Sequence, residues 1–173
     1  FSRDEYLEFE GNQAIGHVRY TTAGDSGLLN AQPLVFRYTG GQVAVAHNGN
    51  LVNAKRLRDQ LERQGSIFQT NSDTEVVSHL IARAGPPIDH AFQDALRVID
   101  GAYALLLMTE KQMIAAQDPR GFRPLSLGQF ENAWVVSSET CALNTLGADF
   151  VREIKPGELL VFDEKGLHMR SFT

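Results

Sequence analysis

The chain has 173 residues, 43% of them apolar, which is enough for one well-buried core and a single domain. Its 16 basic and 21 acidic residues give a net charge of -5 without a basic block, so we expect no nucleic-acid partner. The longest apolar run, residues 102–108, is far shorter than the roughly 20 residues that cross a bilayer, and no signal peptide opens the chain, which indicates no membrane partner and a cytoplasmic location.

Residues 13–20 alternate in a way that predicts a strand, and a long loop with Gly24 and Gly27 follows. Loops of this length in compact domains are often functional, so this one could fold over a ligand. Arg19, at the end of the predicted strand, has a guanidinium that could grip a substrate carboxylate. The residues alone slightly favour an arginine in solvent.

Residues 34–38 and 42–46 predict a hairpin, and the turn-forming His47-Asn48-Gly49-Asn50 follows at once. We interpret this as a strand that delivers an elbow, with a helix behind it. At such an elbow the Asn48 carboxamide and the Gly49 N–H can point together into a cleft, as an oxyanion hole requires. The alternative is a helix cap with Asn50 before Leu51, and the residues alone favour the cap.

A helical apolar stripe from Leu51 to Leu61 ends at Gly65, and residues 66–70 predict another short strand. Ser72 and Glu75 fit a capping box that starts the next helix, which ends near residues 85–87. Asp73, at that helix start, suits either the helix dipole or a ligand ammonium group, and capping is favoured. A further helix is predicted over residues 90–99.

The second half is mainly β. Strands are predicted at 102–109, 113–117 and 133–138, a turn at 118–121, a short helix at 138–146, and a terminal hairpin formed by 158–162 and 167–172. The run 102–108 is apolar at every position, so we expect both faces of this strand to be covered.

The single cysteine, Cys141, excludes an internal disulfide and a cysteine-rich metal site. Its apolar, helical surroundings favour a buried structural thiol over a reactive one. The histidines lack metal-ligand spacing, so we expect no metal and no cofactor in this chain. From the residues alone, Asn48-Gly49, Arg19 and Asp73 describe a site for an α-amino acid whose distal carbonyl is attacked, without a nucleophile.

Six separated blocks resemble the amidophosphoribosyltransferase family, the class II glutamine amidotransferases that open purine synthesis. The blocks run in order along nearly the whole chain: GHVRYTTAG at 16–24, HNGNLVN at 47–53, GSIFQTNSDTE at 65–75, DPRGFRPLSLG at 118–128, SSETCAL at 137–143 and KPGELLVF at 155–162. The glutaminase domain of glucosamine-6-phosphate synthase has analogous HNG and DTE blocks and ranks second. A non-catalytic glutamine-binding module that has lost its nucleophile is the alternative of another class.

The resemblance implies an α+β fold, the four-layer αββα sandwich of N-terminal-nucleophile hydrolases, incomplete at the N-terminus. It implies that glutamine is hydrolysed to glutamate and ammonia, and that the ammonia is transferred to phosphoribosyl pyrophosphate, giving 5-phosphoribosylamine. In that family Asn48 and Gly49 correspond to the oxyanion hole, Arg19 to the clamp for the glutamine α-carboxylate, and Asp73 to the acceptor for its α-amino group. Tyr20 and Thr22 belong to the loop that closes over glutamine.

The family's nucleophile is a processed N-terminal cysteine several dozen residues before the GHVRY block, whereas Phe1 stands 15 residues before Gly16. We therefore expect residues 1–173 to be a partial glutaminase domain, inactive alone, with the N-terminal segment and the phosphoribosyltransferase domain absent. Magnesium is expected in the absent domain, and the presence of an iron–sulfur cluster is left open. The parent enzyme is expected to be a homo-oligomer, and an exposed sheet edge should make the isolated piece aggregate or associate.

Overall fold

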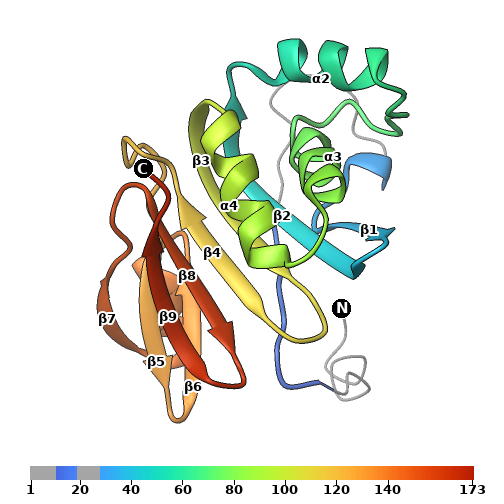
Figure 1. Cartoon of the computed structure of the whole chain (residues 1–173). Coiled ribbons are helices and arrows are strands. Elements are labelled where there is room, and N and C mark those ends of the chain that lie inside the picture. Colours follow the sequence, from blue (N-terminus) through green and yellow to red (C-terminus); the bar gives the residue numbers. More distant parts are fainter. Residues whose placement is uncertain (1–10, 19–27) are drawn as a thin grey trace.

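The computed structural model describes residues 11–18 and 28–173, and two antiparallel sheets form its centre (Figure 1). The larger sheet has six strands in the order β1-β2-β3-β4-β8-β9, and the smaller one has three in the order β6-β5-β7. The strands of the larger sheet are β1 Leu34–Tyr38, β2 Gly41–Leu51, β3 Gly101–Met108, β4 Met113–Gln117, β8 Glu158–Asp163 and β9 Gly166–Ser171, and those of the smaller sheet are β5 Ser126–Phe130, β6 Ala133–Ser137 and β7 Asp149–Glu153.

Helices cover one face of the larger sheet (Figure 1). They bury their apolar stripes, among them Leu57, Val77 and Phe92, against sheet residues such as Leu105 and Ile114. Burial of such stripes is what holds amphipathic helices on a sheet. The helices are α2 Ala54–Arg63, α3 Thr74–Ala84 and α4 Ile88–Val98, and a 3₁₀ turn, η1 Leu28–Asn30, precedes β1.

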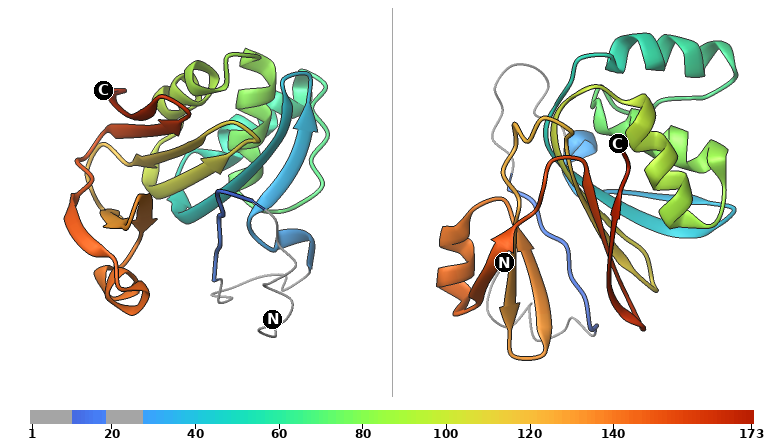
Figure 2. Two further views of the ribbon diagram at one scale, coloured as in Figure 1. Left: turned by 90° about the horizontal axis from the view of Figure 1, so that it is seen from below. Right: turned by 60° about the vertical axis from the view of Figure 1, so that its left-hand side comes forward.

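The smaller sheet packs on the opposite face of the larger one and is covered in turn by α5, Thr140–Leu146 (Figure 2). Leu127 of β5 lies in the core between the sheets with Ala104 and Leu160. Its neighbour Gly128 faces the other way, since a Cβ there would meet Leu143 of α5. The layers therefore run helices, sheet, sheet, helix, which confirms the predicted αββα class.

Strand β3 is buried on both faces, as its continuous apolar run predicts. Tyr103, Leu105 and Leu107 contribute to the core under the helices, whereas Ala104 lies in the core between the sheets. The hairpin β1–β2, the helices α3, α4 and α5, and the terminal hairpin β8–β9 also lie where the sequence predicts them. Within the described part, no helix is long and apolar enough to span a bilayer.

The predicted elbow at residues 47–50 is wrong, because β2 continues through all four residues to Leu51. Pairing with β3 over this whole stretch, Asn48 with Ala104 and Asn50 with Ala102, overrides the turn preference of the four residues. The cap assigned to Asn50 is wrong too, since α2 begins at Ala54 and Asn53 occupies the N-cap position.

Two other predicted strands are wrong because their backbones find no partner strand in the described part. Residues 66–70 form no strand, and the N–H groups of Gln69 and Thr70 donate to the Glu75 carboxylate instead. This use of Glu75 also replaces the predicted capping box, since α3 has no side-chain cap at its N-terminus. Residues 13–18 form no strand, and residues 19 and 20 lie outside the described part.

An ion pair joins the two sheets between Arg152 of β7 and Glu158 of β8. The guanidinium donates to both carboxylate oxygens, at 2.7 and 2.8 Å, and the Lys155 N–H donates to one of them at 2.8 Å. Burial alone would raise the pKa of Glu158, but the hydrogen bonds from Arg152 and Lys155 and the positive charge of Arg152 outweigh it, so the pKa lies below its ordinary value.

A lowered carboxyl pKa means that the folded state binds the proton more weakly than the unfolded state. The stabilisation by Glu158 is therefore fully present above the unfolded pKa, about 4.3 for glutamate, and is lost as the pH falls through the lower folded pKa. We expect the difference in thermal unfolding midpoint between the full-length protein and its Glu158→Gln variant to be largest near neutral pH and to shrink below about pH 4.3. A difference that stays constant with pH would contradict this.

Candidate active site

Strand β2 presents a row of backbone N–H groups on the side away from β3. The His47 N–H donates to Oε1 of Gln32 at 2.6 Å, and the Leu51 N–H donates to Oδ2 of Asp73 at 2.8 Å. In an antiparallel strand, alternate residues direct their N–H groups to the same side. Gly49 lies between His47 and Leu51, so its N–H points to this side as well. It is flanked by the N–H groups that bond to Gln32 and Asp73.

The Gly49 N–H is not used by the sheet. Tyr103 lies opposite Gly49, but the Tyr103 N–H donates to Asp118 at 3.3 Å and its carbonyl accepts from the Asp118 N–H at 2.9 Å. Both groups of Tyr103 thus point away from β2. On the other side of β2, the pairing with β1 ends at Val45, so among the described strands none bonds to Gly49. With respect to residues 11–18 and 28–173, this N–H is available to a ligand.

The backbones of β2 and β3 approach so closely at position 49 that only glycine fits there. Its φ is +149°, and a Cβ at this position would lie 2.8 Å from the Tyr103 Cα and closer still to the Ala102 carbonyl oxygen. The short separation follows from the pairing, because opposite residues that do not exchange hydrogen bonds come closest in an antiparallel ladder. Any larger side chain would push β2 and β3 apart.

The Asn48 side chain lies on the opposite face of β2 from His47. Asn48 pairs with Ala104, and Ala104 belongs to the core between the sheets, so the Asn48 carboxamide points toward the smaller sheet. It makes no hydrogen bond to another described residue. The donor pair predicted from the sequence is therefore carried by consecutive strand residues rather than by a turn, with Asn48 contributing a side chain and Gly49 a backbone N–H.

The Asp73 side chain is hydrogen-bonded to the same end of β2. Besides the hydrogen bond from Leu51, one of its oxygens lies 3.5 Å from Nδ1 of His47, and its side chain keeps 25% exposure. Burial alone would raise the pKa of Asp73, but the hydrogen bond and charge of His47 and the N–H groups of Leu51 and Thr74 outweigh it and lower the pKa. Asp73 occupies the N-cap position of α3, as predicted, but its side chain makes no cap hydrogen bond. An ionised, partly exposed carboxylate remains.

The other predicted substrate residues, Arg19, Tyr20 and Thr22, lie outside the described residues. Gln32 follows this segment in the chain and lies next to the site. Its side chain accepts a hydrogen bond from the N–H of His47, the neighbour of Asn48. Gln32 carried no prediction. Its only sequence signal is its place in the QPL triplet between the loop and β1.

A second supporting residue, Asp118, was predicted only as part of a turn. Its carboxylate is fully buried and accepts hydrogen bonds from the N–H groups of Arg120, Phe122, Arg123 and Tyr103, at 2.9 to 3.3 Å. Charged acceptors of this kind fix a loop rigidly. By bonding to the backbone of Tyr103, Asp118 also keeps the N–H and C=O of this residue directed away from Gly49, which lies opposite it.

Cys141 is not part of this arrangement. The prediction of a buried thiol is wrong, because Cys141 is exposed. It lies on α5, which covers the side of the smaller sheet that faces away from the larger one (Figure 2). The smaller sheet therefore separates this thiol from Asn48 and Gly49. Among the described residues, no group of three or more acidic, histidine or cysteine side chains is placed to hold a metal ion.

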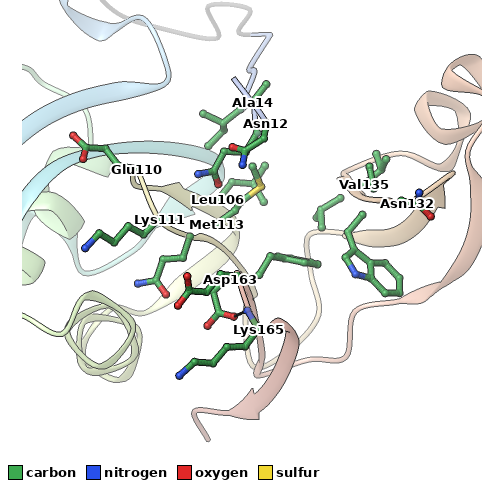
Figure 3. A pocket seen from close by; sticks show the side chains of 18 of the residues that line it. Asn12, Ala14, Leu106, Glu110, Lys111, Met113, Asn132, Val135, Asp163 and Lys165 are labelled. Atoms are coloured by element: carbon green, nitrogen blue, oxygen red, sulfur yellow. Dashed lines mark hydrogen bonds between the residues drawn. The ribbon is translucent and has the colours of Figure 1, made fainter. Parts of the chain in front are cut away.

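A cavity of about 1060 Å³ opens between the two sheets at the other end of the strands (Figure 3). Apolar side chains of both sheets line it, among them Leu106, Phe162 and Trp134, and Lys111 and Asp163 lie on its wall. Asn48, Gly49 and Asp73 are not among its lining residues. The chemistry that the residues suggest therefore lies outside this cavity.

Comparisons with known proteins show which family the chain resembles. A model of the glutamine amidotransferase domain matches residues 17–145. An amidophosphoribosyltransferase of Bacillus subtilis is 51% identical over the whole of this chain and 37% of its own length. A chloroplastic amidophosphoribosyltransferase of Arabidopsis thaliana is also 51% identical, over 96% of this chain and 30% of its own length. The chain thus spans about a third of the length of these curated relatives.

Solved structures give the same result. A glutamine phosphoribosylpyrophosphate amidotransferase from B. subtilis, complexed with ADP and GMP, superimposes with a TM-score of 0.86 and 52% identity. A structure described as the allosteric regulatory enzyme of purine biosynthesis superimposes with a TM-score of 0.87 and 53% identity. Each alignment covers 91% of this chain and 34% of the solved chain.

Proposed function

The chain belongs to the glutamine amidotransferase domain family, and on this premise we propose that it is the glutamine-binding part of an amidophosphoribosyltransferase. The parent protein would hydrolyse glutamine to glutamate and ammonia and transfer the ammonia to phosphoribosyl pyrophosphate, which gives 5-phosphoribosylamine for purine synthesis. Identity of 51% along the whole chain to curated enzymes of that name supports this choice. Glucosamine-6-phosphate synthase and a non-catalytic module are therefore not favoured.

One structural observation carries the proposal for the site. The Gly49 N–H points out of the ladder, next to the Leu51 N–H that holds Asp73. A glutamine that places its amide oxygen at Gly49 and Asn48 would lie along this end of β2, where Asp73 offers an ionised carboxylate to its α-ammonium group. Arg19 would take the α-carboxylate, and Tyr20 and Thr22 would close over the substrate.

The reaction follows from these positions together with a nucleophile outside this chain. The thiolate of the processed N-terminal cysteine attacks the amide carbon, and the carbonyl oxygen becomes an oxyanion held by Asn48 and Gly49. The C–N bond then breaks, ammonia leaves with a proton supplied through the cysteine's α-amino group, and a thioester remains. Water hydrolyses the thioester to glutamate and restores the thiol. Two preorganised donors stabilise each tetrahedral intermediate without reorganisation.

The remaining parts of the parent protein are also assigned by the family. The N-terminal segment would bring the cysteine to Asn48 and Gly49, and the phosphoribosyltransferase domain would hold phosphoribosyl pyrophosphate and magnesium. We propose that the parent protein is a homo-oligomer in the cytoplasm.

The function is tested by assaying the full-length protein with glutamine, phosphoribosyl pyrophosphate and magnesium. We expect 5-phosphoribosylamine and glutamate in equal amounts, and phosphoribosylamine also when ammonium chloride replaces glutamine. Replacing phosphoribosyl pyrophosphate with a hexose phosphate should give no aminated product. Amination of the hexose phosphate would assign the protein to the synthase instead, and binding of glutamine without any turnover would assign it to the non-catalytic module.

A further inference from the structure

We infer that His47 is a positioning residue, which acts on glutamine by holding the Asp73 carboxylate in the orientation that receives the α-ammonium group. This inference rests on the proposed function and adds to it a residue with no contact to the substrate. It assigns His47 neither to proton transfer nor to the oxyanion.

His47 and Asp73 meet from two elements that are distant in the sequence. His47 lies in β2 on the face that carries the helices, beside Leu105 of β3, and Asp73 stands at the start of α3. Nδ1 of His47 lies 3.1 Å from Oγ1 of Thr74 and 3.5 Å from Oδ1 of Asp73. The imidazole thus contacts one Asp73 oxygen while the Leu51 N–H holds the other.

These contacts favour an imidazole that carries a proton on Nδ1. With the proton on Nε2 instead, the Nδ1 lone pair would face the Asp73 carboxylate, and two electron-rich groups would be buried side by side. With the proton on Nδ1, the imidazole is a donor toward both Thr74 and Asp73. The carboxylate is then fixed by one donor at each oxygen.

The other ring nitrogen argues against a role in proton transfer. Only 1% of the His47 side chain is exposed, and Nε2 is buried without a hydrogen-bond partner among the described residues. A general base must reach the proton that it removes, directly or through one water. His47 makes its polar contacts only through Nδ1, and these contacts can orient the Asp73 carboxylate. The buried, unpaired Nε2 destabilises the fold, and we interpret this destabilisation as tolerated because His47 orients Asp73.

The test uses the full-length protein and two substrates, glutamine and glutaramate, which is glutamine without its α-ammonium group. Asp73 can bind only glutamine in this way, because glutaramate has no α-ammonium group. His47→Gln removes the donor at Nδ1 and places an amide near Nε2, whereas His47→Asn keeps an amide donor near Nδ1. We expect His47→Gln to lower kcat/KM for glutamine roughly 10- to 100-fold, mainly through KM, because an oriented bond to a charged group is lost.

Glutaramate hydrolysis should change less than about 2-fold in the same variant, and His47→Asn should recover most of the glutamine activity. Ammonium-dependent formation of phosphoribosylamine in each preparation reports whether the protein is folded. An equal loss for glutamine and glutaramate, an unchanged glutamine KM in His47→Gln, or a failure of His47→Asn to recover activity would overturn the inference. Asp73→Asn separates it from the proposed function: if that variant still prefers glutamine over glutaramate as the wild type does, the role of Asp73 itself is wrong.

Discussion

Replacing Asn48 with alanine in the full-length protein should lower kcat for glutamine hydrolysis roughly 100- to 1,000-fold, the usual effect of removing one side-chain donor from an oxyanion hole. The Asn48 carboxamide points toward the smaller sheet and makes no hydrogen bond to another described residue, so its loss should leave the fold intact. The donor is needed when charge develops on the oxygen, so KM for glutamine should change much less than kcat.

Asn50→Ala is the matched control for this variant. Asn50 has the same side chain, lies two residues further along β2 on the same face, and is exposed. We expect its kcat to stay within about 2-fold of the wild type, since exposed polar residues away from the reacting atoms contribute little. Full glutaminase activity in Asn48→Ala, or an equal loss in both variants, would show that Asn48 is not an oxyanion donor.

Replacing Gly49 with alanine should destabilise the protein through backbone strain and a steric clash. The added Cβ would lie 2.8 Å from the Tyr103 Cα and closer to the Ala102 oxygen, and φ is +149°. Backbone strain of about 1–3 kcal/mol and overpacking of about 1–3 kcal/mol together give a loss of about 2–6 kcal/mol in the free energy of unfolding. Both strands at the site should exchange their amide hydrogens faster.

Hydrogen–deuterium exchange of peptides from β2 and β3 measures this change in the full-length protein. Gly65→Ala is the control, because Gly65 also has a positive φ, of 93°, but open space where its Cβ would be. It should show the cost of backbone strain without the clash. Exchange in Gly49→Ala no faster than in Gly65→Ala would mean that β2 and β3 do not approach as closely as the structure indicates.

The sequence predicts the elements whose patterns are long and regular. The apolar run of β3 and the stripes of α3 and α4 predict these elements and their buried faces, because periodicity reports which side of an element is covered. The short strands β5 and β7 were missed. Gly128 interrupts β5, and β7 is mostly exposed, with only Arg152 partly covered, so neither shows the alternation of a half-buried strand.

The sequence predicts the candidate site residues but not their geometry. The motif His47-Asn48-Gly49-Asn50 consists of turn-forming residues, and only pairing with β3 decides that it is a strand. That pairing depends on residues more than fifty positions away, which the local turn preference of residues 47–50 does not take into account. The contacts of Asp73 with His47 and Leu51, and those of Asp118 with Tyr103, also join distant segments. The spacing of residues in the sequence does not predict these contacts, which hold the polar side chains in fixed positions.

The central claim is that glutamine lies along the end of β2, and a crystal structure of the full-length protein with bound glutamate, the expected product, tests it most directly. The account predicts a γ-carboxylate oxygen within about 2.7–3.1 Å of both the Gly49 nitrogen and Nδ2 of Asn48, with the α-ammonium group hydrogen-bonded to Asp73. Glutamate bound elsewhere, or bound with its α-ammonium group at Gly49 and away from Asp73, would contradict it.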